Sequence, residues 1–197
     1  LNEVTWDLRT TPPKTATGGS KPDNGGFIAP MVLPGDYTIK LYVGDKEYSE
    51  MVTLVNDDKG KMTLDDRKTQ YDAAMKCYSM HENLAKLADT INHTIDIVKA
   101  AADKDPKNKK LAVFLDSLKA FKGTLMATKQ TSVFADEERL REKITKAYAG
   151  VCYQEARPTN LQTQNIDFLS GELEKSVKKG NDLLMQYQAK WKSTFKG

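Results

Sequence analysis

The first part of the chain alternates apolar and polar residues, which is the pattern of half-buried β-strands. The clearest run covers residues 37–43, where every second position is apolar. Weaker alternation over residues 4–8 and 48–55 predicts further strands, the latter with a slip in phase that would suit a β-bulge. The segment that begins at Gly44 predicts a hairpin turn, and residues 10–26 predict a long loop.

Beyond residue 60 the spacing of apolar residues changes to three and four, which predicts amphipathic helices. A long first helix is expected from Asp65 to just before Pro106, because proline disfavours helix in the preceding residue. A second helix is expected over residues 111–125, and a third after Asp136 as its N-cap. The last helix carries an apolar stripe over residues 166–195 with near-heptad spacing.

Four amphipathic helices joined by short links favour an antiparallel up-and-down bundle. The link at residues 103–108 is too short for anything but an antiparallel neighbour. Gly180 falls on the stripe of the last helix, where it would allow either a close helix approach or a bend.

These patterns predict an α+β chain of two domains. Residues 1–60 are expected to form part of an immunoglobulin- or fibronectin-like β-sandwich, and residues 61–197 an antiparallel four-helix bundle. A sandwich of this type has about seven strands, whereas about four are visible here. The uncovered apolar face must then meet strands upstream of Leu1, another molecule, or the helical half of the chain.

Composition excludes some classes of function but does not identify one. The 197 residues include 30 Lys and Arg against 27 Asp and Glu, a net charge of +3, so no nucleic-acid partner is predicted. No apolar run reaches the roughly 20 residues of a membrane-spanning helix. The N-terminus shows neither a signal peptide nor an initiator Met, so we expect the chain to begin inside a longer protein. Lysines on the last helix, at 175, 178, 179, 190 and 192, are interpreted as a solvated face.

Two cysteines and two histidines leave little room for a metal site. Cys77 and His81 lie four residues apart and share a helical face, but no carboxylate-rich motif accompanies them. The favoured interpretation makes Cys77 and Cys152 small buried apolar residues. A disulfide between them, suited to an oxidising compartment, is the alternative. No metal or cofactor is predicted.

No catalytic residue is predicted either. Asp57 and Asp58 lack the spacing of a calcium-binding loop, and Asp65 and Asp66 suit the positive end of a helix. The chain has no Gly-rich phosphate loop, no Gly-x-Ser-x-Gly and no His-Glu-x-x-His. This leaves the aromatic residues of the strand region as candidates for binding.

Trp6, Tyr37 and Tyr42 form the candidate binding surface. Aromatic side chains on a strand can stack against a sugar ring, which would make these three a glycan platform. Such residues also serve as core or cross-strand pairs, which is the alternative interpretation.

The strand region resembles a known family. The resemblance rests on Val4-Thr5-Trp6-Asp7-Leu8-Arg9, Phe27-Ile28-Ala29-Pro30, Pro34-Gly35-Asp36-Tyr37-Thr38 and Val52-Thr53-Leu54-Val55-Asn56-Asp57. These stretches resemble the C-terminal region of bacterial sortilin-like, BNR-repeat β-propeller proteins, common in Bacteroidetes and often described as glycosyl-hydrolase-like. Where that family has Asp-Pro-Arg, this chain has Asn56-Asp57-Asp58-Lys59.

The resemblance implies an exported, multi-domain parent protein, and it transfers no catalytic residue because an active site would lie in the propeller. The leading hypothesis is therefore a non-catalytic accessory module that packs on, or positions, an upstream β-propeller of the same polypeptide. A module that binds a glycan or a cell-surface protein is the second hypothesis. A fragment of a glycosyl-hydrolase-like enzyme, with its active site upstream, is the third.

Overall fold

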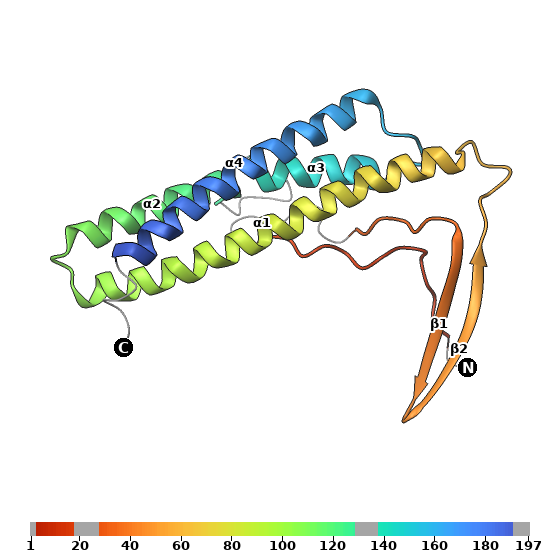
Figure 1. Ribbon diagram of the computed structural model, residues 1–197, viewed down its shortest axis with the longest axis horizontal. Coiled ribbons are helices and arrows are strands. Elements are labelled where there is room, and N and C mark those ends of the chain that lie inside the picture. The colour runs from red at the N-terminus through yellow and green to blue at the C-terminus, as the bar shows by residue number, and fades with distance from the viewer. Residues whose placement is uncertain (1–2, 18–27, 129–137, 191–197) are drawn as a thin grey trace.

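The structure, a computed structural model, is a bundle of helices from which a β-hairpin projects (Figure 1). It describes residues 3–17, 28–128 and 138–190. In chain order the elements are β1 (Gly35–Val43), β2 (Lys46–Leu54), α1 (Leu64–Lys104), α2 (Lys109–Leu125), α3 (Leu140–Cys152) and α4 (Asn160–Lys190). Three sequence predictions lie outside the described residues: the N-cap at Asp136, most of the loop at 10–26, and the end of the last stripe beyond residue 190.

The predicted β-sandwich is wrong. In the described residues the strands form one antiparallel sheet of β1 and β2. Residues 4–8 form no strand, and beside them Arg9 makes a single bridge to Met31. Local hydrogen bonds replace strand pairing here, since the Trp6 indole donates to the Arg9 carbonyl at 3.0 Å and the Arg9 amide donates to Asp7 at 3.1 Å. A turn thus outcompetes the extended conformation that the alternation favours.

The hairpin itself is confirmed. β1 and β2 pair in one uninterrupted register from Gly35 opposite Leu54 to Val43 opposite Lys46, so the predicted bulge in β2 is wrong. Two residues connect the strands, and Gly44 takes a φ of +58° at the first of them. A glycine with positive φ at that position suits the hairpin turns that match the twist of the strands.

α1 begins and ends where its sequence indicates. The Thr63 hydroxyl accepts a hydrogen bond from the Asp66 amide, and the Asp66 carboxylate accepts one from the Thr63 amide, which together form a capping box. Hydrogen bonds from Thr63, and then from Arg157, lower the pKa of Asp66 below its ordinary value. Arg157 also pairs with Asp65 at 2.5 Å and so ties the segment before α4 to the start of α1.

All four predicted helices are present and pack together, but not in the predicted antiparallel order. α1 and α4 run parallel, while α2 and α3 follow each other along one side of them in the opposite direction (Figure 1). The prediction that α2 returns antiparallel to α1 is confirmed. At 41 residues, α1 is long enough to carry α2 (17 residues) and α3 (13 residues) in succession, which makes three rows of helices instead of four.

The core lies between these rows and also receives residues from the N-terminal segment. Ala16 and Ile28, both within the region predicted as a sandwich, are buried with the helices. The largest apolar side chains that are fully buried come from all four helices: Leu84, Ile91, Leu111, Leu118, Leu125, Ile144, Tyr148, Ile166 and Leu169.

Gly180 lies where three helices approach one another closely. A Cβ built on Gly180 would lie 2.6 Å from the Leu87 Cδ1 atom and 3.1 Å from the Phe121 Cε1 atom. The absence of a side chain therefore lets α4 pack directly on α1 and α2, and the predicted close helix approach is confirmed.

We expect Gly180→Ala to be less stable than Gly171→Ala by about 1–3 kcal/mol in free energy of unfolding, because only the first substitution overpacks the core. Gly171 is also within α4, but a Cβ there meets no atom within 4 Å. Each variant gains about 1 kcal/mol of helix propensity, which cancels in the comparison. Urea unfolding followed by circular dichroism measures the difference, and equal stabilities would contradict the close packing at Gly180.

Candidate functional site

One face of the hairpin is apolar and lies open to solvent. The register places the alternate residues of both strands on this face, where Lys46 and Glu50 are the charged members. We call its apolar members the apolar hairpin face: Tyr37, Ile39, Leu41, Val43, Tyr48, Val52 and Leu54. About half of the surface of Ile39, Leu41 and Tyr48 is exposed, at 50%, 57% and 54%. Figure 1 shows why, since the hairpin extends away from the helices.

The opposite face of the hairpin is mainly polar. Lys40 and Glu47 form an ion pair at 2.7 Å, and the Thr53 hydroxyl donates to the Asp36 carboxylate at 2.6 Å. The apolar hairpin face carries one carboxylate, that of Glu50, which stands opposite Ile39. The hairpin is therefore amphipathic, like a strand pair from the surface of a larger sheet or sandwich.

A two-stranded sheet is marginally stable in water by itself, and it needs further strands or a packed layer to persist. Each apolar side chain removed from water contributes about 25 cal/mol per Å² of buried area. Both strands are also edges, with backbone groups on their outer sides that no described strand pairs. The hairpin thus offers a face and two edges to a partner.

Local contacts surround the base of the hairpin, and one of them reaches α1. The Tyr37 hydroxyl donates to the Leu33 carbonyl at 2.6 Å, and the Trp6 ring meets the Tyr37 ring edge-on at 5.3 Å. After β2, the Asn56 side chain donates to the Met62 carbonyl and accepts a hydrogen bond from Arg67 at 2.6 Å. The hydrogen bond from Arg67 therefore joins the segment after β2 to α1.

The structure brings together two of the three predicted aromatic residues. Trp6 and Tyr37 touch, with their ring planes 63° apart. Tyr42 lies near the turn and on the opposite face of β1, where 64% of its surface is exposed. The three rings therefore do not share one surface.

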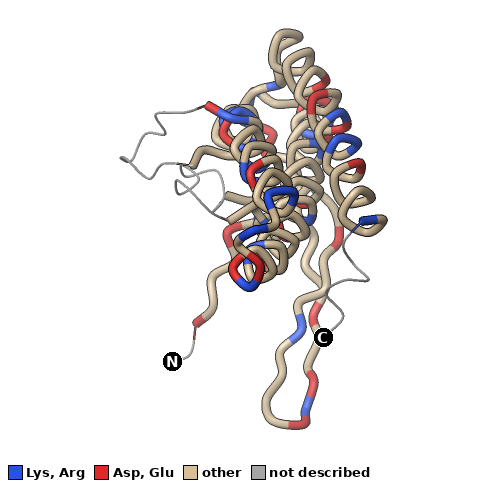
Figure 2. The backbone as a smooth tube through the Cα atoms, turned by 90° about the vertical axis from the view of Figure 1, so that its left-hand side faces the viewer, with Lys and Arg blue, Asp and Glu red and all other residues tan. Residues whose placement is uncertain are grey.

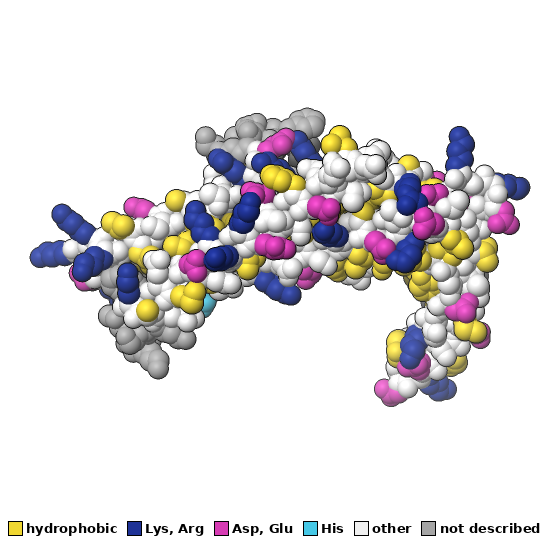
Figure 3. Space-filling view, turned by 45° about the horizontal axis from the view of Figure 1, so that its top comes forward, with side chains coloured by type: hydrophobic (Ala, Val, Ile, Leu, Met, Phe, Trp, Pro, Cys, Tyr) yellow, Lys and Arg dark blue, Asp and Glu magenta, His cyan; other side chains and the backbone are white. Residues whose placement is uncertain are grey.

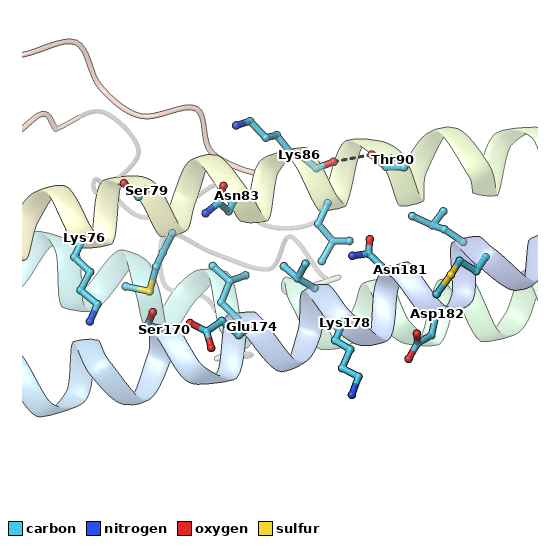
Figure 4. Close-up of a pocket in the computed structure, with 16 residues that line it drawn as sticks. Lys76, Ser79, Asn83, Lys86, Thr90, Ser170, Glu174, Lys178, Asn181 and Asp182 are labelled. Carbon is cyan, nitrogen blue, oxygen red and sulfur yellow. Dashed lines mark hydrogen bonds between the residues drawn. The ribbon is translucent and has the colours of Figure 1, made fainter.

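A second open feature is a groove of about 940 Å³ between α1 and α4 (Figure 4). Its floor is apolar and includes Met80, Leu87 and Leu173, whereas polar side chains from both helices form its rims. Sequence reasoning missed this groove. The sequence feature that could have indicated the groove is the row of small polar residues beside the apolar stripe of α1, such as Ser79 and Asn83.

The helix surfaces outside the groove carry charges of both signs. Figure 2 shows basic and acidic residues interspersed along the helices and the hairpin. Lys175, one of the lysines predicted to be solvated, pairs with Glu172 at 2.8 Å and is exposed. Figure 3 likewise shows basic and acidic side chains intermingled along the face that it presents.

The two cysteines lie at the interface of α1 and α3. Cys77 is fully buried and Cys152 is 7% exposed, which confirms the prediction that they are buried small residues. Both are free thiols in the structure, without the alternative disulfide. Burial raises the pKa of Cys77 to about 12 and that of Cys152 to about 11, so neither forms a reactive thiolate near neutral pH.

His81 lies beside these cysteines and is completely buried. Its ring meets the Tyr148 ring edge-on at 5.7 Å, and neither ring nitrogen has a hydrogen-bond partner. Burial, and then the nearby charge of Arg141, lowers the pKa of His81 to about 4. No group of three His, Cys, Asp or Glu residues in the described part of the chain could hold a metal ion.

A buried ion pair ties the N-terminal segment to α3. Arg141 and Glu142 pair at 2.6 Å, and Arg141 also donates to the Ala16 carbonyl at 2.9 Å. Glu142 accepts a hydrogen bond from the Ala127 amide at 3.1 Å. Because both charged groups are occupied in holding chain segments, they are structural residues and not candidates for catalysis.

The remaining acidic candidates have local roles. The Asp57 carboxylate accepts a hydrogen bond from the Lys59 amide at 2.9 Å, and the Gly60 amide donates to the Asp57 carbonyl. These contacts close the turn that leads into α1.

Comparisons with known proteins do not identify the chain. No family model, no curated protein and no solved structure matches it. The resemblance to sortilin-like, BNR-repeat proteins stays a prediction. Among the helices that the structure describes, none has the length and apolar character needed to cross a membrane.

We expect His81 to make the fold sensitive to acid. The neutral form is favoured in the folded state, so the stabilisation relative to the unfolded chain is present above a pH of about 6.5 and is lost as the pH falls towards about 4. Between about pH 7 and pH 5 this amounts to about 2 kcal/mol. His81→Leu should remove that pH dependence, as measured by urea unfolding at both pH values.

The matched control is His93→Gln on the same helix, since His93 is exposed. This variant should keep the pH dependence of the parent protein. A His81→Leu variant that loses as much stability in acid as the parent would contradict the assignment.

Proposed function

We propose that the chain is a non-catalytic interaction module, in which the helical bundle is the support and the hairpin is the docking element. The observation that carries this proposal is the apolar hairpin face, whose side chains are about half exposed on an arm that the helices do not cover. Exposed apolar surface of this kind is typical of interaction sites.

A β-sheet is the partner that fits this face best. Side chains on the hairpin alternate with the period of a pleated sheet, and two sheets pack face to face at about 10 Å with interdigitating side chains. Such packing would supply the layer that a lone hairpin lacks. Glu50 would be buried in the contact, so the partner sheet should carry a basic side chain at the corresponding place.

We infer that this sheet belongs to the upstream β-propeller region of the same polypeptide, and that the parent protein is exported. The family resemblance supports this inference. Two residues that carry the resemblance, Trp6 and Tyr37, contact each other at the base of the hairpin. Their contact helps to set the direction of the docking element, which gives them a role in docking geometry instead of ligand stacking.

No observation favours the glycan-binding alternative to a similar degree. A sugar ring stacks on the flat, open face of an aromatic side chain, whereas Trp6 and Tyr37 present themselves edge to face. The enzyme-fragment hypothesis likewise gains nothing from the described residues, where the buried titratable groups hold the fold together.

Leu41→Thr should weaken binding to the upstream region at least tenfold, because it replaces an apolar contact with a polar group while keeping a residue that favours strands. Calorimetric titration of this chain with the separately expressed upstream region measures the effect. Tyr42→Thr is the matched control, since Tyr42 is the next residue, is similarly exposed, and lies on the opposite face.

The control should bind like the parent chain. No binding by the parent chain, or equal loss in both variants, would contradict docking through the apolar hairpin face.

A further inference from the structure

The α1–α4 groove offers a second surface, independent of the hairpin. Figure 4 shows α2 and α3 behind the α1–α4 pair, so the groove opens on the side that these helices leave uncovered. It follows the two parallel helices from Lys76 and Ser170 to Thr90 and Met185. The surface on this side of the three-row bundle is therefore formed by the parallel helices α1 and α4.

The floor of the groove is suited to helix packing. Val177 and Leu184 continue the apolar floor and are partly buried, and Met185 at one end is 58% exposed. Ser79, Asn83 and Ser170 on the rims are small, and so would allow the backbone of another helix to approach closely. A pair of helices could rest here with its own apolar stripe over this floor.

The charges on the rim of α4 favour a second copy of the same chain. Glu174 and Lys178 both line the groove, one helical turn apart, and neither forms an ion pair with another described residue. In a two-fold dimer with antiparallel helices, α4 faces α4 of the second copy. Glu174 of each copy then meets Lys178 of the other, so that one charge pair forms twice.

A parallel dimer would have less favourable charge contacts than the antiparallel dimer. The ion pair between Lys76 and Asp167, and the contact of Leu87 with Gly180, put Lys86 level with Lys178. Parallel packing would lay α1 of one copy on α4 of the other and bring these two lysines together. Like charges in direct opposition disfavour such a contact.

Asn83 lies near the axis that the antiparallel arrangement requires. Figure 4 shows Asn83 on α1 level with Glu174 on α4. An amide side chain both donates and accepts hydrogen bonds, so two Asn83 side chains can pair with each other across a two-fold axis. A single polar residue of this kind can set the register of packed helices.

From these observations we propose that the chain forms an antiparallel two-fold dimer through the α1–α4 groove, with Glu174 and Lys178 as reciprocal partners. The dimer leaves the hairpin free for its own partner. It would therefore present two hairpins, one from each copy.

Sedimentation velocity over a range of concentrations tests the dimer. All variants carry Leu41→Thr, so that the apolar hairpin face does not contribute to association. Glu174→Lys and Lys178→Glu should each weaken dimerisation roughly tenfold, because each places like charges opposite each other twice. The double variant E174K/K178E should restore it, since the exchanged charges again complement each other.

Lys175→Glu is the matched control, because it makes the same charge change as Lys178→Glu but Lys175 does not line the groove. It should leave dimerisation unchanged. A chain that stays monomeric at every concentration, a control that weakens the dimer as much as Lys178→Glu, or a double variant without recovery would each overturn the proposal.

Discussion

Burial of the apolar stripe of α1 determines how the other three helices are arranged. This helix of 41 residues packs against α2, α3 and α4, and no other helix matches its length. Its burial requires neighbours along the whole length, which two short helices and one long helix supply. Gly180 allows a close contact of α4 with α1 and α2, and the hydrogen bond from Arg141 to the Ala16 carbonyl ties the N-terminal segment to the same core. The bundle therefore buries most of the apolar stripe of α1, and the groove between α1 and α4 remains open.

The apolar face of the hairpin also needs neighbours that bury it, and the described chain does not supply them. Its strands have the register, the turn and the alternation of a stable sheet element, yet the side chains that would form a core remain about half exposed. At the base of the hairpin, Tyr37 and Asn56 make hydrogen bonds to the neighbouring segments, to the carbonyls of Leu33 and Met62. The proposed function rests on this contrast between helices that share a buried core and a sheet that has none.

Periodicity predicted the helices and the hairpin because spacing determines which face of an element is buried. It does not determine which neighbour covers that face, so the three rows of helices and the missing sandwich could not be foreseen. Periodicity also did not predict where local hydrogen bonds would replace strand pairing, as in the turn around Trp6. In the candidate site, the open side chains of residues 37–43 were visible as an alternating run. The interactions of His81 and Arg141 depend on contacts between distant segments, which no local pattern encodes.

Native-state hydrogen exchange of the isolated chain measures whether the hairpin is less stable than the bundle, because it reports local stability amide by amide. We expect strong protection in the middle of α1, where Leu84 and Ile91 are buried, and exchange at least a hundredfold faster throughout β1 and β2. Hairpin amides that are protected as strongly as those of α1 would show a sheet that is already stable without a partner, and would contradict the account.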